Sequence, residues 1–361
     1  MRVLASSPVS SPSQLYQDAA AGRGGYEGQL ADELQAQLAA QYAGVRPEDC
    51  DFYHTLDLGG GEVRHGVWDI RGRERSYLGW VDVKGLRVLE IGPATGHLTF
   101  HMAKAGADVI CFDLPPGGAP DIIPQEGHDL EAHRRTGVEY MDRVRNSWWY
   151  GRRRLGLAPR AVYGDIYKLP SDLRRFDVST FTSVLMHLSN PFAALRQAAT
   201  LTDKAVIVTE PIARIPADPE VGRVEFAPMG THETVVVWWQ LSAGAIMKML
   251  RVFGFLEFSV HYHLQTYHPN HEMDKPPVEA LFYTLVAERH QGWAPRLSRT
   301  EAERAAEEEV RRAWSTGPSP NDSTGENALR AELAGLRSSL SWRLTRPVRM
   351  VGSLFRRAGL R

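Results

Sequence analysis

The stretch VLEIGPATGHLTFHMAKAGADVICFDLP, residues 88–115, decides the fold. A short apolar run is followed by glycines at 92 and 96 and by a helical pattern that begins at His97. A second apolar run then occupies residues 108–112. A buried strand, a glycine turn, a helix and a second strand in this order predict a parallel β-α-β unit.

The glycine turn has the chemistry of a nucleoside site. Gly92 and Gly96 let the backbone approach a ligand, and the helix that follows offers free N–H groups to an anionic part of it. Asp113, 17 residues after Gly96, ends the next strand and can accept hydrogen bonds from both ribose hydroxyls. A dinucleotide fingerprint would need glycines at 94 and 97, where this chain has Ala94 and His97. The spacing therefore indicates a nucleoside with a small carboxylate rather than a diphosphate.

Short apolar runs alternate with helical patterns on both sides of this unit. The predicted strands are 87–91, 108–112, 161–163, 177–181 and 205–209, and the predicted helices are 29–42, 97–105, 128–155, 191–201, 242–253 and 300–314. Two more strands, 255–263 and 278–288, have no helix between them, which predicts an antiparallel pair at the sheet edge. The pattern predicts an α/β fold with a doubly wound sheet.

Composition divides the chain into five segments. Residues 1–25 predict a disordered N-terminus, and residues 26–85 a helix and a lid segment. Residues 86–290 form the domain that contains the sheet. A charged helix and linker follow at 291–326, and 327–361 combine a leucine-spaced helix with a basic amphipathic tail.

The overall composition excludes several classes of protein. The 361 residues are 43% hydrophobic and 24% charged, as in a folded globular chain. No apolar run approaches the ~20 residues that a bilayer span needs, and the N-terminus lacks an apolar signal segment. Cys50 and Cys111 are the only cysteines, which excludes a disulfide scaffold and a cysteine-based zinc module. We therefore expect a cytoplasmic protein.

The net charge of −1 combines an acidic body with a basic tail. Residues 337–361 hold seven arginines and no acid, so residues 1–336 carry a formal charge of −8. An acidic body argues against a broad nucleic-acid-binding face. Within 341–357, arginines are interleaved with apolar side chains, which predicts either peripheral contact with the inner membrane face or a helix partner.

Residues 88–115 resemble motif I of class I S-adenosylmethionine-dependent methyltransferases, in which the middle glycine is often replaced, here by Ala94. Later segments that resemble the family in the same order are 163–166, 181–188 and 238–255. The resemblance covers residues 50–288. It implies a Rossmann-like, seven-stranded sheet with S-adenosyl-L-methionine as the cofactor and no metal.

The resemblance also implies a set of cofactor contacts. They are Glu90, Gly92, Pro93, Gly96, Asp113, Leu114, Asp165, Ile166 and Thr182. In the family, the acid at the position of Asp165 binds the adenine amino group, and the residue at Ile166 lies against the ring.

Three residues are candidates for the catalytic step. A hydroxyl nucleophile needs a base near neutral pH, and imidazole suits this role. Ligands of this topology lie at the carboxyl ends of the strands, so His187 and Glu210 should face the crevice. We predict His187 as the base or substrate orienter, with a packing histidine as the alternative. His54, beside Tyr53, could close over the site, or the two could form a structural edge segment.

Three further clusters each have two interpretations. Trp148–Tyr150 either flank the ligands or belong to the core, and Arg152–Arg154 either hold an acceptor phosphate or stay solvated. The histidines 261, 263, 268 and 271, near Glu272, either line the acceptor pocket or hold a metal. The absence of an accompanying cysteine disfavours the metal.

The leading hypothesis is O-methylation of a sugar, a glycan or another small hydroxylated acceptor, because 341–357 also resembles the tails of surface-polysaccharide enzymes. A tRNA wobble-uridine-type modifying methyltransferase is the alternative, since residues 53–61, 147–156 and 184–191 resemble that narrower group. A third hypothesis is an inactive cofactor-binding module that recruits partners. The intact glycine turn, Asp113 and Asp165 argue against the third.

Overall fold

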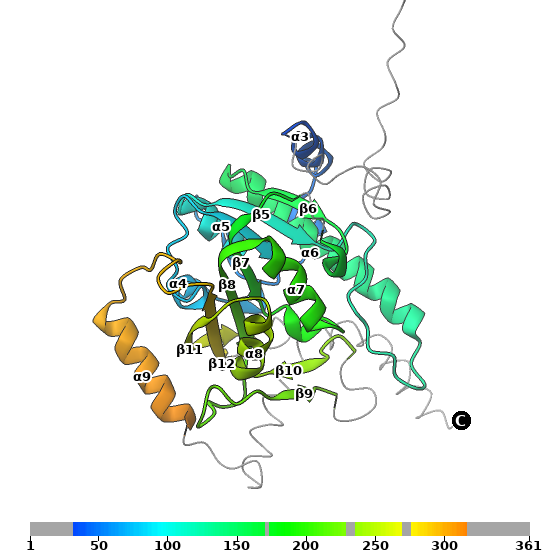
Figure 1. Ribbon diagram of the computed structural model, residues 1–361. Coiled ribbons are helices and arrows are strands. Elements are labelled where there is room, and N and C mark those ends of the chain that lie inside the picture. Colours follow the sequence, from blue (N-terminus) through cyan, green and yellow to red (C-terminus); the bar gives the residue numbers. More distant parts are fainter. Residues whose placement is uncertain (1–31, 170–172, 229–234, 269–275, 316–361) are drawn as a thin grey trace, which may run out of the picture.

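An eight-stranded mixed sheet forms the centre of the computed structural model, which describes residues 32–169, 173–228, 235–268 and 276–315 (Figure 1). The strand order is β3-β11-β12-β8-β7-β4-β5-β6. The strands are β3 (Trp68–Asp69), β4 (Arg87–Ile91), β5 (Asp108–Asp113), β6 (Arg160–Tyr163), β7 (Phe176–Thr182), β8 (Thr202–Pro211), β11 (Glu257–Tyr267) and β12 (Val278–Glu288). Strands β4 to β8 are parallel, and β12, β11 and β3 join antiparallel.

The predicted α/β fold with a doubly wound sheet and an antiparallel strand pair is confirmed, but the number of strands differs. The sheet has eight strands rather than seven because β3 pairs with the end of β11, where Trp68 lies opposite Tyr267. The β11–β12 pair is at the sheet edge along most of β11, because β3 covers only Thr266 and Tyr267. A two-residue strand is too short to leave an alternating pattern in the sequence.

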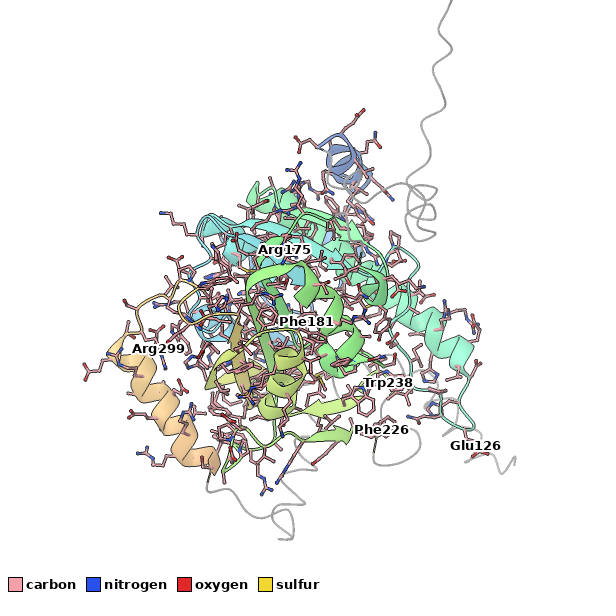
Figure 2. The ribbon with its side chains drawn as sticks, viewed as in Figure 1. Glu126, Arg175, Phe181, Phe226, Trp238 and Arg299 are labelled. Carbon is pink, nitrogen blue, oxygen red and sulfur yellow. The ribbon has the colours of Figure 1, made fainter. Side chains whose placement is uncertain are left out.

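Helices cover both faces of the sheet (Figure 1). The helices of the described residues are α3 (Asp32–Gln41), α4 (Glu74–Tyr77), α5 (His97–Lys104), α6 (Leu130–Leu155), α7 (Pro191–Leu201), α8 (Ala243–Val252) and α9 (Glu301–Ser315), of which α3 and α9 lie at the periphery. Along β4, Val88 packs with α5, α6 and the N-terminal segment, whereas Leu89 and Ile91 pack with α7 and α8. Phe181 lies at the centre of this packing in Figure 2 and is fully buried.

Capping residues set the ends of the long helices. The Asp129 side chain accepts a hydrogen bond from the Ala132 N–H at 2.9 Å before α6, and Gly156 ends α6 in the left-handed conformation. Asn190 caps α7 in the same way. The strand–helix boundaries at the carboxyl edge of the sheet are thereby fixed.

Short elements complete the described chain. They are the hairpins β1 (Leu56–Asp57)–β2 (Val63–Arg64) and β9 (Val224–Phe226)–β10 (Trp239–Leu241), and the 3-10 turns η1 (Pro47–Asp49), η2 (Ile166–Lys168) and η3 (Leu185–His187). In the described ranges, no helix is both long enough and apolar enough to cross a bilayer. The predictions for residues 1–25 and for the tail at 327–361 lie outside those ranges.

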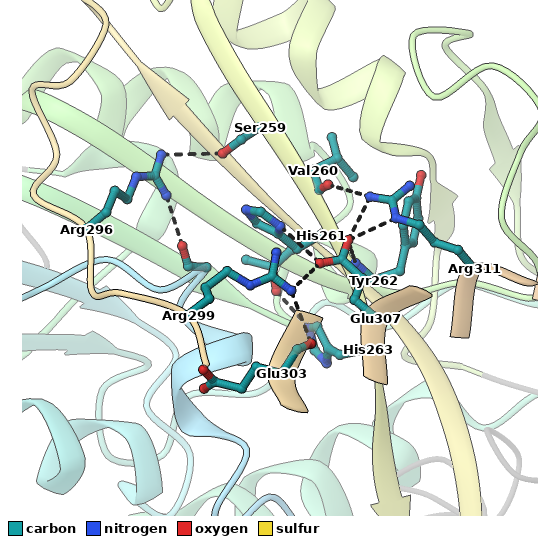
Figure 3. Close-up of polar contacts among 12 residues, drawn as sticks. Ser259, Val260, His261, Tyr262, His263, Arg296, Arg299, Glu303, Glu307 and Arg311 are labelled. Carbon is teal, nitrogen blue, oxygen red and sulfur yellow. Dashed lines mark hydrogen bonds and ion pairs between the residues drawn. The ribbon is translucent and has the colours of Figure 1, made fainter. Parts of the chain in front are cut away.

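Helix α9 is attached to β11 by one buried acid (Figure 3). Glu307 is 7% exposed, and its carboxylate lies within 2.7 Å of both Arg299 and Arg311. On β11, the same carboxylate lies 3.4 Å from His261 Nδ1. Burial raises the pKa of Glu307, but the hydrogen bonds and charges of His261 and Arg311 outweigh burial and hold it at about 2. Glu307 is therefore an ionised anchor for α9.

Candidate active site

The glycine turn lies where the sheet changes its winding direction, between β4 and its neighbour β7. Ligands of doubly wound folds bind at this position. Gly92 has φ +66°, and a Cβ there would lie 2.7 Å from Val184 Cγ2, just beyond β7. Gly96 has φ +88°, and its Cβ would lie 2.7 Å from both Phe100 and Trp148. Both positions therefore require glycine because of neighbouring side chains as well as any ligand.

Two non-glycine residues near the turn have positive φ. Ala94 has φ +48° and Ser183, directly after β7, has φ +58°. L-residues pay a conformational cost in this region, and such residues often lie at functional sites. Backbone strain is thus present on both sides of the switch point.

Asp113 stands at the carboxyl end of β5 with one carboxylate oxygen occupied. Its Oδ1 accepts a hydrogen bond from the Leu114 N–H at 2.8 Å, and within the described chain Oδ2 has no partner. Burial raises the pKa of Asp113, and the charge of Arg145 opposes this rise. Arg145, which is 3% exposed on α6, donates to the Leu114 and Pro115 carbonyls at 2.9 and 3.1 Å. Sequence reasoning missed Arg145, because it is 32 residues away on the neighbouring helix.

Five of the other predicted cofactor residues lie at the edge of the sheet where the parallel strands end. Pro93, Leu114, Asp165, Ile166 and Thr182 lie at or just after the carboxyl ends of β4, β5, β6 and β7. Asp165 is the exposed N-cap of η2, where its Oδ1 accepts from the Tyr167 N–H at 2.9 Å.

Glu90, predicted as a cofactor contact, has a different environment. It is 1% exposed and accepts hydrogen bonds from Thr99 Oγ1 at 2.5 Å and Cys111 Sγ at 3.3 Å, under α5. Burial raises its pKa to about 7. Glu90 therefore fixes α5 to the sheet and does not face the switch point.

A small pocket opens beside the switch point. It is lined by Tyr53, His54, Trp68, Tyr77, Ser183, Met186, His187, Pro211 and Phe282. These residues come from the segment before β3, from β3 and α4, from the turn after β7 and η3, from the end of β8 and from the middle of β12. The structure thus brings His54 and His187 into one pocket.

The tautomer of His187 follows from one hydrogen bond. Its Nδ1 lies 2.7 Å from the Val236 carbonyl oxygen. A carbonyl can only accept, so Nδ1 carries the proton and Nε2 keeps a lone pair. Burial lowers the pKa of His187, which keeps the ring neutral at pH 7. The neutral ring therefore has an unprotonated Nε2.

His54 is held against the glycine turn. Its backbone N–H donates to Thr95 Oγ1 at 3.1 Å, and its Nδ1 lies 3.3 Å from the same hydroxyl. Burial and, to a lesser degree, the charge of His97 lower the pKa of His54 to about 3. His54 is therefore a neutral side chain that lines the pocket and contacts Thr95 of the glycine turn.

Glu210, predicted as a catalytic residue, lies behind the pocket rather than in its wall. It is 1% exposed, and its Oε1 accepts from the Leu185 N–H at 2.9 Å. Burial raises its pKa to about 8, although the backbone N–H groups of 184–186 act in the opposite direction. Glu210 therefore contacts the turn that leads into His187, while its buried Oε2 has no hydrogen-bond partner in the described residues.

Asp121, which sequence reasoning missed, joins the two sides of the site. Its Oδ2 accepts from the Tyr167 hydroxyl, beside Ile166, and from the Ser189 N–H and Oγ, both at 2.7 Å. The Asp121 carbonyl accepts from Trp238 Nε1 at 3.1 Å. The segment after β5 is thus attached to both η2 and the turn after η3.

The aromatic, arginine and histidine clusters for which the sequence left two interpretations mostly contact other parts of the protein. Trp148, Trp149 and Tyr150 are buried in the core. Arg152 donates to the Pro159 carbonyl, Arg153 donates to the carbonyls of residues 42, 43 and 45, and Arg154 donates to Glu62. His263 bonds to Thr284 and Gln265, and none of the histidines 261, 263 and 268 is in the pocket wall. The described residues contain no cluster of three metal-ligating side chains, and His271 and Glu272 lie outside them.

Comparisons with known proteins identify one family model. A model described as a methyltransferase domain matches residues 64–255. No curated protein matches the chain.

Several solved structures are similar at low identity. Magnesium protoporphyrin IX methyltransferase from Synechocystis, with bound S-adenosylmethionine, is 18% identical over 60% of this chain and 78% of its own, with a TM-score of 0.36. The 1,6-didemethyltoxoflavin-N1-methyltransferase from Burkholderia thailandensis, with bound 1,6-didemethyltoxoflavin and S-adenosylhomocysteine, is 13% identical over 79% of this chain and 92% of its own, with a TM-score of 0.35. The N-terminal domain of EvdMO1, crystallised with S-adenosylhomocysteine and D-fucose, is 16% identical over 74% and 100%, with a TM-score of 0.37.

Proposed function

The chain belongs to the methyltransferase-domain family, and on that premise we propose that it transfers a methyl group from S-adenosylmethionine to a hydroxyl oxygen of a small acceptor. The observation that carries the proposal is the His187 imidazole, whose Nδ1–H is bound by the Val236 carbonyl at 2.7 Å in the wall of the pocket. This contact leaves a basic nitrogen beside the switch point of the sheet. The glycan acceptor depends on residues 341–357, outside the described ranges, and stays a prediction.

The residues at the switch point fit the proposed cofactor. The Gly92–Gly96 turn provides close backbone approach, and the unpartnered Oδ2 of Asp113 can accept hydrogen bonds from a ribose. Asp165 and Ile166 follow β6, next to Asp113, whose carbonyl accepts from the Gly164 N–H at 3.0 Å. When bound, the cofactor supplies an electrophilic methyl on a sulfonium.

His187 is the group that moves the proton. Its Nε2 would take the proton of the acceptor hydroxyl, whose oxygen would receive the methyl group from the cofactor that the Gly92–Gly96 turn and Asp113 would hold. Correct alignment in such a displacement contributes ~7–11 kcal/mol to lowering the barrier. Glu210 holds the 184–186 backbone, and Val236 holds the ring, so that Nε2 has one orientation.

The first experiment is calorimetric titration of the full chain with S-adenosylmethionine, S-adenosylhomocysteine and NAD. We expect micromolar binding of the first two ligands and none of NAD. Binding of NAD alone would contradict the cofactor assignment, because it would show that the turn accepts a diphosphate.

The second experiment separates the base from the fold. In His187→Asn the side-chain amide can still donate to the Val236 carbonyl, but no basic nitrogen remains. Release of S-adenosylhomocysteine with an acceptor panel should fall by roughly 10²–10⁴-fold, while cofactor affinity stays unchanged. His290→Asn, at an exposed histidine far along the chain, is the control. Equal turnover in His187→Asn and the wild type would exclude His187 as the base.

A further inference from the structure

The residue that directly follows the glycine turn has no part in the proposed chemistry, but it binds two other segments. This residue, His97, begins α5 and occupies the position where a dinucleotide fingerprint would have its third glycine. The His97 side chain is buried, with 8% of its surface exposed. Its Nδ1 lies 3.0 Å from the Thr55 carbonyl oxygen, and its Nε2 lies 2.9 Å from Glu74 Oε1. His97 therefore connects the turn to the segment just before β1 and to α4.

Both partners of the His97 ring are hydrogen-bond acceptors. A carbonyl oxygen can only accept, so Nδ1 donates to Thr55. Burial raises the pKa of Glu74, but the hydrogen bond and the charge of His97 outweigh burial and hold it at about 2. The ionised Glu74 carboxylate also only accepts, so the ring makes both bonds as an imidazolium. A hydrogen bond between two ionised groups is stronger than one between neutral groups, which makes the bond to Glu74 a firm attachment.

The bond to Thr55 attaches the N-terminal segment to the turn. Thr55 directly follows His54, which lines the pocket. The His54 N–H donates to Thr95 Oγ1 at 3.1 Å. Two consecutive residues of this segment are thus bound to the turn, one contact before Gly96 and one after it. We therefore expect the pocket wall at His54 to follow any displacement of the turn.

The bond to Glu74 attaches α4 to the turn. Glu74 begins α4 and Tyr77 ends it, so both side chains belong to one turn of helix. Tyr77 lines the pocket, and its hydroxyl lies 3.0 Å from Ser183 Oγ, directly after β7. Through α4, the glycine turn after β4 is linked to the chain after β7, on the other side of the switch point.

We propose that His97 is a positioning residue that joins the cofactor turn to the acceptor pocket, so that a ligand bound at the turn also fixes α4 and the segment that carries His54. This inference rests on the proposed function, because the ligand at the turn is S-adenosylmethionine or S-adenosylhomocysteine. His97 acts through Thr55 and Glu74 and needs no contact with either reactant. Binding of the cofactor thereby prepares the pocket before the acceptor arrives.

The test compares four forms of the full chain, namely the wild type, Glu74→Leu, Glu74→Gln and Glu288→Leu. Leucine at position 74 removes the acceptor of the Nε2 proton, whereas the amide oxygen of glutamine can still accept it. Glu288→Leu is the matched control for the loss of a buried acid. Glu288 is 8% exposed and lies 2.7 Å from Arg296, but it pairs with Ala205 near the amino end of β8, away from the turn.

Two quantities are measured with S-adenosylhomocysteine, its calorimetric affinity and the hydrogen exchange of residues 74–78 with and without it. We expect the ligand to slow exchange in 74–78 in the wild type, in Glu74→Gln and in Glu288→Leu, and to leave exchange unchanged in Glu74→Leu. The affinity should fall roughly tenfold in Glu74→Leu, which loses a hydrogen bond between charged groups, and should stay within about threefold in the other two variants.

The wild type alone can overturn the proposal. If S-adenosylhomocysteine binds without slowing exchange in 74–78, the link through His97 is absent, whether or not the variants fold. Equal losses in Glu74→Leu and Glu288→Leu would also overturn it, since both would then report lost stability, and so would full protection of 74–78 in Glu74→Leu. In all these cases the methyltransferase proposal stands. If the ligand fails to bind the wild type, the proposed function is wrong and the role of His97 falls with it.

Discussion

Replacement of Ala94 by glycine should stabilise the protein, because Ala94 has a left-handed backbone with φ +48°. An L-residue in this region pays ~1–2 kcal/mol relative to glycine. The larger conformational freedom of glycine in the unfolded chain lowers this stabilisation by roughly 0.5–1 kcal/mol. The net expectation for Ala94→Gly is a gain of about 0.5–1 kcal/mol. For a domain of this size, that gain corresponds to a melting temperature higher by about 1–4 °C.

The assay is differential scanning calorimetry of the wild type and two variants. Ala105→Gly is the matched control, because Ala105 ends α5 with φ −73°, where glycine brings no relief and should lower the melting temperature. Affinity for S-adenosylhomocysteine should stay within about twofold in Ala94→Gly, because no contact is removed. A lower melting temperature in Ala94→Gly would refute the reasoning, since it would show that the Ala94 methyl contributes more by packing than its conformation costs.

Three further predictions concern contacts described above. Asp113→Ala should weaken S-adenosylhomocysteine binding by ~1–3 kcal/mol through the lost ribose hydrogen bonds, and an unchanged calorimetric affinity would remove Asp113 from the site. Asp121→Ala should speed hydrogen exchange at the Ser189 amide, which loses its acceptor, and should weaken cofactor binding through η2; exchange as slow as in the wild type would contradict the bridge. Glu307 has a pKa held at about 2, below its ordinary value, so its stabilising contribution is complete above about pH 4.5 and is lost as the pH falls towards 2. Urea unfolding at pH 5 and pH 3 should therefore show a smaller loss of stability in Glu307→Gln than in the wild type, and parallel losses would exclude Glu307 as an anchor.

Local sequence signals predicted the fold well where the chain alternates between buried runs and glycine or proline boundaries. The strands β4 and β12 and the helix α7 have the predicted bounds, because their apolar runs end at polar or helix-breaking residues. The two-residue β3 could not be predicted, since its pairing with β11 depends on tertiary packing around Trp68 and Tyr267.

The sequence predicted only part of the candidate site. Positions at strand ends could be identified, but the direction of a side chain depends on the two-residue alternation of the strand. In β4, Glu90 shares the face of the buried Val88, and this alternation could have predicted its contacts with Thr99 and Cys111 under α5. Arg145 and Asp121 act through contacts 30 or more residues away in the chain, and no local pattern encodes such pairs.

The contact between His187 and Val236 has a consequence for the evolution of the site. The hydrogen bond from Nδ1 is accepted by a main-chain carbonyl and not by a side chain. The tautomer of His187 is therefore kept by every amino acid at position 236 that leaves the backbone undistorted. The side chain at position 236 can therefore vary during evolution while the hydrogen bond that the proposed base needs is kept.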